Sequence, residues 1–265
     1  MQIMRAAALL YVCALIPLSV GAQQAAPTPA PSAERDPQAL AILQQSLEAM
    51  GGIQPSDSVA TGTVTPVAGG QTNQGTIRIL TKGTAESLVQ FTMPNSVETT
   101  IYANGEASQT VNSTQIPFPL EPTVTSQAAE FPLPLILALI NNPDTSFQYV
   151  GIETLSGESL YHIKTWDSFA SLPAFQNLSS FSARDVWIDS NTSLPQRISY
   201  TRYPAQGDGG TMTDVFFTNY LKSSGILYPS AISESLNGTP WATITVQSVA
   251  FDTGLSDSNF PVQAQ

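Results

Sequence analysis

The stretch from Asp185 to Thr201 reads DVWIDSNTSLPQRISYT. Its first five residues and its last six residues alternate polar with apolar side chains, and the Asn, Thr and Ser at 191–193 favour a turn between them. Because side chains alternate across a β-strand, this pattern predicts two antiparallel strands that each bury one face. The stretch opens a longer meander that continues to Phe251.

The rest of the meander carries the same signals. The predicted strand 211–221 has two faces, one with Val215, Phe217 and Leu221 and the other with Met212, Phe216 and Tyr220. Asn237-Gly238 tolerates the positive φ of a tight hairpin, and a last strand follows at 241–251. Earlier strands are predicted at 59–66, 76–82, 88–93, 97–103, 109–111, 146–150 and 159–165. We therefore expect a mainly β (α+β) fold, a curved antiparallel sheet or incomplete β-barrel.

The N-terminal part predicts export and then one domain. Residues 1–22 have the basic start, apolar stretch and small final residues of a secretory signal peptide, which contains the single cysteine, Cys13. Residues 23–35 are rich in Ala and Pro and predict a flexible leader. Residues 36–265 are expected to form a single β domain without a membrane span. Without Cys13, the mature chain is expected to lack disulfides and thiol chemistry.

Two helices are predicted to cover the sheet. Asp36-Pro37 favours a helix start, and four apolar residues then recur at helical spacing up to Gly51: Leu40, Leu43, Leu47 and Met50. Residues 131–140, FPLPLILALI, are apolar on every side and too short to cross a membrane. This segment must be buried, either as a plug in the concave face or as the wall of a hydrophobic cavity. The two interpretations differ in whether Leu139→Asp would unfold the protein or only abolish ligand binding.

Charge and composition exclude several classes of function. The chain has 9 basic and 20 acidic residues, for a net charge of −11. Nucleic acids and anionic membranes require patches of Lys and Arg, so neither is expected as a partner. His162 is the one histidine, is expected at the surface, and has no Gly-x-Ser-x-Gly serine to act on. We expect no catalytic residues, no metal site and no cofactor. A hydrolase with paired carboxylates is the remaining enzymatic alternative.

Three features together resemble the outer-membrane lipoprotein-sorting and carrier family, the LolA/LolB/LppX-like proteins. They are a signal peptide followed by a short helix ending in Gly51-Gly52, the strand-turn-strand 186–198, and a closing pattern made by Tyr220, Gly225, Tyr228-Pro229, Ile232, the stretch 249–255 and Phe260. The resemblance implies an incomplete antiparallel barrel closed by helices, with a hydrophobic cavity for acyl chains. The Pro-rich segment 115–134 departs from that family, and Arg78 is the nearest match to its early-strand arginine.

The leading hypothesis is a non-enzymatic periplasmic protein that binds a lipid, a lipoprotein acyl chain or another apolar ligand, with release from the cell as the alternative location. Strand alternation and the apolar segment select the candidate ligand-binding residues Val89, Phe91, Ile101, Leu133, Leu135, Ile136, Leu139, Tyr161 and Ile163. The rival hypothesis is an envelope structural or interaction module with a self-filled cavity. Its partner would bind Phe169 and Phe175 in the loop 166–181, which carries aromatic residues expected to be exposed.

Overall fold

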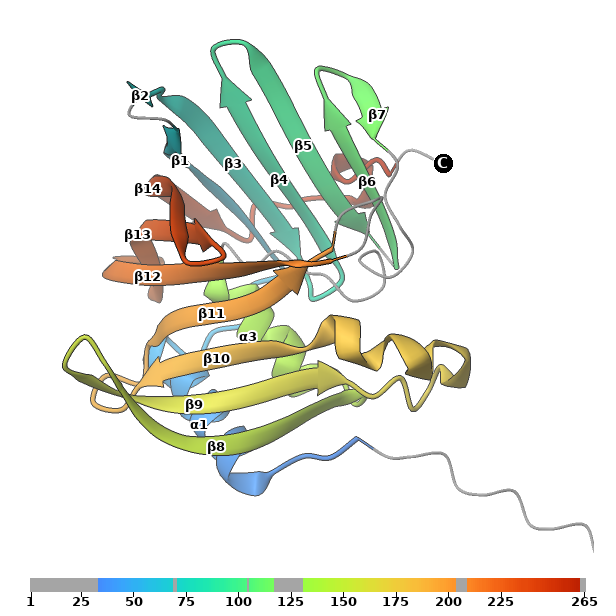
Figure 1. Cartoon of the computed structure of the whole chain (residues 1–265), viewed down its shortest axis with the longest axis vertical. Coiled ribbons are helices and arrows are strands. Elements are labelled where there is room, and N and C mark those ends of the chain that lie inside the picture. The colour runs from blue at the N-terminus through green and yellow to red at the C-terminus, as the bar shows by residue number, and fades with distance from the viewer. Residues whose placement is uncertain (1–32, 69–70, 104, 117–130, 204–208, 263–265) are drawn as a thin grey trace, which may run out of the picture. The chain divides into compact units, whose positions relative to one another are not determined.

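The computed structural model describes residues 33–262, apart from residues 69–70, 104, 117–130 and 204–208. Its strands form one antiparallel sheet in the order β7-β6-β5-β4-β3-β1-β14-β13-β12-β11-β10-β9-β8, and β2 pairs with β1 outside this path (Figure 1). Within the described residues the edge strands β7 and β8 do not pair with each other, so the sheet stays open. The predicted mainly β fold with an open antiparallel sheet is confirmed. The predicted signal peptide and leader residues 23–32 lie outside the described residues.

The strands are β1 (Asp57–Ala68), β2 (Gln71–Thr72), β3 (Gly75–Lys82), β4 (Glu86–Met93), β5 (Ser96–Ala103), β6 (Glu106–Val111), β7 (Thr114–Ile116), β8 (Thr145–Leu155), β9 (Glu158–Asp167), β10 (Arg184–Asp189), β11 (Pro195–Arg202), β12 (Thr211–Ser223), β13 (Ile226–Leu236) and β14 (Thr239–Phe251). The helices are α1 (Pro37–Ala49), α3 (Pro132–Asn141) and the 3-10 helices η1 (Pro173–Ser182) and η2 (Asp257–Asn259).

Strand β1 joins two meanders into one sheet. Strands β3 to β7 follow one another as neighbours, and so do β8 to β14. Strand β1 pairs with β3 on one side and with β14 on the other, so that Val64 lies opposite both Gly75 and Ile244. The first and last strands of the domain are thus adjacent, which a reading of local sequence cannot reveal.

The turns form where local chemistry favours them. Asn237 and Gly238 both have positive φ, 48° and 76°, in the hairpin between β13 and β14, as predicted. Between β10 and β11, the Asp189 carboxylate accepts hydrogen bonds from the backbone amides of Asn191 (3.0 Å) and Thr192 (2.6 Å). These turns set the register of the strands they connect.

The predicted alternation of β12 fails at its C-terminal half. Val215 and Phe217 are fully buried as expected, but Leu221 is 51% exposed. Tyr220 packs partly buried against the core instead, and its hydroxyl donates a 2.6 Å hydrogen bond to the Pro195 carbonyl. Asn219 has a φ of 55°, outside the β region, and this local break accompanies the change of faces.

Helix α1 starts as predicted but buries a different stripe. The Asp36 carboxylate accepts hydrogen bonds from the amides of Gln38 (2.8 Å) and Ala39 (3.3 Å). The buried residues are Ala39, Ile42, Leu43, Ser46 and Met50, whereas Leu40 and Leu47 are only partly buried. The stripe is shifted because α1 packs against both α3 and β8, so two surfaces share its apolar side.

The residues just before α1 pair with the edge of the sheet. Phe147 of β8 donates its amide to the Glu34 carbonyl (2.8 Å) and accepts from the Asp36 amide (3.1 Å). The Arg35 guanidinium lies 4.4 Å from the centre of the Phe147 ring and donates to the carbonyls of Ile140 and Asn142. Glu34 and Arg35, which composition places in the flexible leader, therefore form part of the folded structure.

The C-terminal segment is tied to the start of β1 by one buried carboxylate. Asp57 is 3% exposed and accepts hydrogen bonds from the amides of Thr253, Gly254 and Leu255 and from the Thr253 hydroxyl. Burial alone would raise the pKa of Asp57, but these hydrogen bonds outweigh it and lower the pKa. The sequence DTGL at 252–255 is thus a structural anchor.

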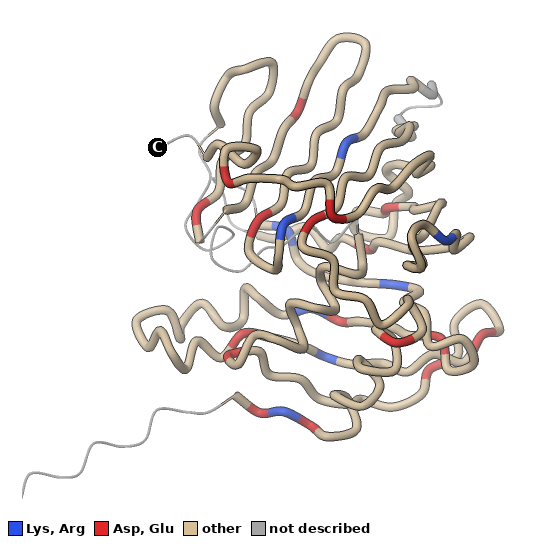
Figure 2. Tube along the Cα trace, turned by 180° about the vertical axis from the view of Figure 1, so that it is seen from behind, with Lys and Arg blue, Asp and Glu red and all other residues tan. Residues whose placement is uncertain are grey.

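The sheet has two apolar faces of unequal size. We call the face that carries the large core and both α-helices the inner face; a smaller cluster lies on the opposite, outer face and contains Leu80, Leu88, Ile101, Ala103 and Phe260. Charged side chains are scattered along the chain rather than gathered in one patch (Figure 2). Among the described helices, none combines the length and the apolar character that spanning a bilayer requires.

Candidate functional site: the inner face of the sheet

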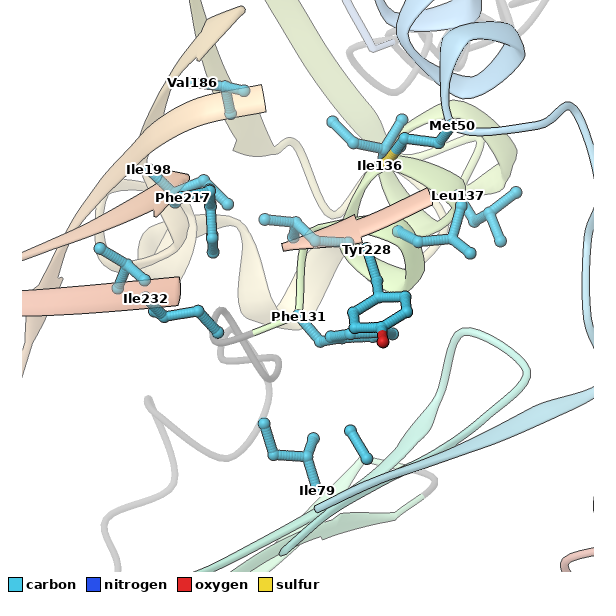
Figure 3. Packing of buried hydrophobic residues seen from close by; sticks show 14 of the residues in the cluster. Met50, Ile79, Phe131, Ile136, Leu137, Val186, Ile198, Phe217, Tyr228 and Ile232 are labelled. Atoms are coloured by element: carbon cyan, nitrogen blue, oxygen red, sulfur yellow. The ribbon is translucent and has the colours of Figure 1, made fainter. Parts of the chain in front are cut away.

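The inner-face core brings most of the predicted ligand-binding residues together. Side chains from β10 to β13 and from α3 project into it (Figure 3). Six predicted residues are buried members of this core: Val89, Leu133, Leu135, Ile136, Leu139 and Ile163. Phe91 and Tyr161 pack against it and remain partly exposed. The predicted set is therefore contiguous with one exception.

Ile101 lies on the outer face. It stands opposite Leu88 in the pairing of β4 with β5, whereas Val89 stands opposite Thr100. Because Leu88 and Val89 point to opposite faces of the sheet, Ile101 joins the outer cluster and cannot line the same surface as Val89. The hairpin register that decides this was not part of the sequence argument.

Helix α3 is packed on all sides. Its side chains from Leu133 to Leu139 are at most 5% exposed, apart from Pro134. The Phe131 ring, which precedes the helix, lies 6.5 Å from the Phe251 ring of β14. Side chains that lined an open cavity of acyl-chain width would keep accessible surface towards it. The geometry of this segment therefore agrees with the plug interpretation of residues 131–140.

A group of half-buried apolar side chains borders the core at β4 and β14. Phe91 and Trp241 make an edge-to-face contact with ring centres 6.0 Å apart, and Met93 also packs against the core. Met93 Sδ lies within 2.5 Å of where a β-carbon at Gly75 would stand, so Met93 rests directly over the backbone of β3. We call Phe91, Met93 and Trp241 the rim.

A bulge directs Trp241 to the inner face. Glu234 pairs with Ala242, but Ser235 pairs with Pro240, so Trp241 is the extra residue of the pair. Ala242 and Ile244 are inner-face residues, and strict alternation would place Trp241 on the outer face. Sequence analysis missed both Trp241 and Met93. The proline that precedes Trp241 is a weak signal of a bulge, because proline disturbs strand pairing.

A second partly exposed apolar group lies at the β8 edge. The rings of Tyr149 and Tyr161 are 6.3 Å apart, and Ile152, which pairs with Tyr161, is 61% exposed. The Asp36 carboxylate accepts a hydrogen bond from the Tyr149 amide, which links this group to the start of α1. The predicted residue Tyr161 thus lies at the opposite end of the inner face from the rim.

Buried charged groups also occupy the inner face. Arg184 is 5% and Asp167 is 9% exposed, and both alternate in step with the inner-face residues Val186 and Ile163. Burial raises the pKa of the Asp167 carboxyl, while Arg184 and a hydrogen bond from Thr145 oppose this rise. Burial also lowers the pKa of Arg184. Glu234, 2% exposed, lies opposite Val215 and Ala242.

His162 is not the surface histidine that the sequence predicts. Its side chain is 12% exposed, and its two ring nitrogens lie 2.7 Å from carboxylate oxygens of Glu153 and Asp185. Its ring stacks on the Trp187 ring with the two ring centres 4.5 Å apart. The Arg197 guanidinium carbon lies 4.3 Å from the centre of the same Trp187 ring. The Trp187 indole donates to Glu153, and this hydrogen bond, with that of His162, lowers the Glu153 pKa against the effect of burial.

This outer-face network connects neighbouring strands of the sheet. His162, Trp187, Arg197 and Phe216 stand opposite one another in register across β9, β10, β11 and β12. Arg197 also donates to Asp214 of β12 (2.6 Å). The partners of the histidine are two carboxylates, with no serine hydroxyl between them. Among the described residues, no group of three or more His, Cys, Asp and Glu is placed to hold a metal ion.

The predicted partner-binding loop is more ordered than expected. Strand β9 extends to Asp167, and residues 173–182 form η1. Phe169 is only 6% exposed, and its ring lies 6.4 Å from that of the half-buried Phe175. The prediction that Phe169 is exposed is therefore wrong, because its ring lies beside Phe175 and is shielded from solvent. Leu172, at 52% exposure, is the apolar residue that the loop presents outwards.

Comparison with known proteins places the fold. No protein-family profile and no curated protein sequence matches the chain. Solved structures do match: a LolA superfamily protein from Nitrosomonas europaea (TM-score 0.56, 16% identity, covering 84% of this chain and 97% of that one), and a putative outer membrane lipoprotein-sorting protein domain from Vibrio parahaemolyticus (TM-score 0.54, 12% identity, 83% and 95%). A DUF1329 family protein from Desulfovibrio piger is similar as well (TM-score 0.51, 15% identity, 83% and 96%).

These identities are low, so the likeness concerns the fold. The matched elements extend over most of this chain. The open antiparallel sheet with helices on one face also agrees with the fold that the sequence resemblance implied. The chain has a LolA-like, lipoprotein-sorting type of fold.

Proposed function

We propose that this protein is a non-enzymatic binding protein of the bacterial envelope that holds the acyl chain of a lipid or lipoprotein on the inner face of its sheet. The observation that carries the proposal is the continuity of the buried core with apolar side chains that stay partly exposed, at the rim and at Tyr161. A bound chain would extend the core, with about 0.8 kcal/mol for each CH₂ group buried. The likeness to lipoprotein-sorting folds supports the same ligand class.

The predicted ligand-binding residues take two roles in this proposal. Phe91 and Tyr161 retain accessible surface and would touch the chain. Val89, Leu133, Leu135, Ile136, Leu139 and Ile163 would form the packed support beneath it, because their side chains are already enclosed. Ile101 faces away and would make no contact. Export through the signal peptide at 1–22 would place the protein in the periplasm.

The proposal is tested by isolating the protein from the periplasm and analysing it by native mass spectrometry and lipid extraction. We expect adducts with the masses of acyl lipids, and we expect the stripped protein to bind added monoacylglycerol. A stripped protein that binds no added lipid, combined with adduct-free spectra, would contradict the proposal.

A second candidate function is an interaction module whose inner face is filled by its own side chains. The enclosure of α3 on all sides supports it. The partner would then contact the loop 168–182 through Leu172 rather than through Phe169. Affinity co-purification distinguishes the two functions. A partner lost on Leu172→Ser, with folding unchanged and no lipid bound, would favour the interaction module over the acyl-chain binding protein.

A further inference from the structure

We infer that the rim of Phe91, Met93 and Trp241 is where the acyl chain contacts the protein, and that this site selects amphiphiles whose head group carries no negative charge. This inference rests on the proposed function and names its site and ligand class. Trp241 and Met93 were not among the residues expected to bind ligand. Two observations support the assignment, incomplete burial and the local charge.

Burial separates the rim from the core residues of the strands beside it. On β3 and β14, the core residues Ile77, Ile79, Ala242, Ile244 and Val246 are at most 3% exposed. Phe91, Met93 and Trp241 pack against the same core but keep accessible surface. An acyl chain laid along them would cover exposed apolar groups without first separating packed residues. Insertion beside α3 would instead require its closely packed side chains to move.

The strands beneath the rim pack closely at two glycines. Gly62 of β1 and Gly75 of β3 carry no side chain, and a β-carbon at either would meet a neighbouring backbone carbonyl. Met93 lies over Gly75, and the Phe91 and Trp241 rings meet above this part of the sheet. The flexible thioether of Met93 can rearrange along a chain at little energetic cost. The rim is therefore an adaptable apolar surface beside a rigid core.

The charge around the rim is of one sign. Strands β1, β4, β5, β6, β7, β13 and β14 contain no Lys or Arg within their bounds. Arg78 of β3 is exposed and pairs with Gln90, on the face opposite to that of Ile77 and Ile79. Glu98 stands directly opposite Phe91 on β5, where it accepts a hydrogen bond from Gln109, and Glu234 pairs with the residue after Trp241.

An anionic head group at the rim would thus meet the Glu98 carboxylate opposite Phe91, and the strands that carry the rim, β4 and β14, supply no Lys or Arg to neutralise it. A neutral or quaternary ammonium head group avoids this repulsion, and the aromatic faces of Phe91 and Trp241 would attract an ammonium group. The ligand class is therefore an acyl chain on a neutral or cationic head, such as an acylated glycerol or choline group, rather than a free fatty acid.

Tryptophan fluorescence tests the site directly. The chain has three tryptophans, and bromine atoms on an acyl chain quench only those that the chain touches. We would titrate the protein with a monoacylglycerol that carries a dibrominated chain. The emission of the wild type should fall, Trp241→Phe should abolish the fall, and the matched control Trp166→Phe should retain it. Trp166 is also half-buried but lies on β9, in step with outer-face His162. Quenching that persists in Trp241→Phe would overturn the assignment.

Head-group selectivity forms the second arm. Chains of equal length with a glycerol, a choline or a carboxylate head would be compared at low ionic strength by competition. We expect the carboxylate to bind about tenfold more weakly, the effect of roughly one unfavourable charge contact, and Glu98→Gln to reduce this difference. A carboxylate that binds as tightly as the others would overturn the ligand class. Acyl-lipid adducts in native mass spectra, combined with no quenching of Trp241 fluorescence, would refute this inference but leave the proposed function standing. A stripped protein that binds none of the three amphiphiles would refute the proposed function.

Discussion

Leu139→Ala should destabilise the protein strongly, because helix α3 is enclosed on all sides. Leu139 is 3% exposed and belongs to the inner-face core. The substitution removes three carbon atoms, worth about 2.5 kcal/mol by transfer alone, and the cavity that remains brings the usual total to about 2–5 kcal/mol. For a domain of this size each kcal/mol lowers the melting temperature by roughly 2–4 °C, so we expect a decrease of about 4–20 °C.

The assay is urea unfolding followed by circular dichroism, which gives the midpoint and the slope for each variant. Leu172→Ala is the matched control, since this leucine is 52% exposed and its truncation should change stability by at most about 0.5 kcal/mol. Leu139→Asp should be more severe than Leu139→Ala, because it buries a carboxylate among apolar side chains. If Leu139→Ala and Leu172→Ala cost the same, or Leu139→Asp melts within a few degrees of the wild type, then α3 lines an open cavity and the packing argument is wrong.

Three further predictions concern the polar anchors. Asp57→Asn should lower the free energy of unfolding by about 1–3 kcal/mol, since the amide cannot accept all four hydrogen bonds. Because the folded-state pKa of Asp57 is lowered, its stabilising contribution is present above the unfolded pKa of about 4 and is lost as the pH falls. Melting curves at several pH values should therefore show that the variant is less sensitive to acid than the wild type. His162→Gln should speed amide hydrogen exchange in β8 and β9, whereas Lys164→Gln, an exposed residue of the same strand, should not; equal protection in both would contradict the bridging role. Tyr220→Phe should cost about 0.5–1.5 kcal/mol through the lost hydrogen bond to Pro195, measured by urea unfolding, and no change would refute that contribution.

The outer-face network illustrates how a sequence pattern can indicate position but not role. The strand 159–165 was predicted with Tyr161 and Ile163 pointing inwards, and this alternation is confirmed. The burial of His162 nevertheless depends on Glu153 and Asp185, which come from neighbouring strands 9 and 23 residues away. Only the pairing of three strands places both carboxylates against the same ring.

The candidate site divides in the same way. The composition of the apolar stretch 131–140 predicted that it is buried, since the exposure of ten uniformly apolar residues to water is unfavourable. Whether it lines a space or fills one depends on the side chains that other elements direct at it. The position of Ile101 on the outer face likewise follows from the register of β4 with β5.

Local chemistry in the sequence determined most of the strands, although not β2, β7 or β13, and it also determined most hairpin turns, the start of α1 and the class of fold. Alternation, turn residues and helix caps act over a few residues, and a local reading can therefore find them. The tertiary structure decided everything that depends on contacts between distant segments. These are the pairing of β1 with β14, the anchoring of the C-terminal segment on Asp57, the shift of the α1 stripe, and the bulge that brings Trp241 to Phe91. Such contacts depend on how strands meet in space, and a one-residue change of register moves a side chain to the other face of the sheet.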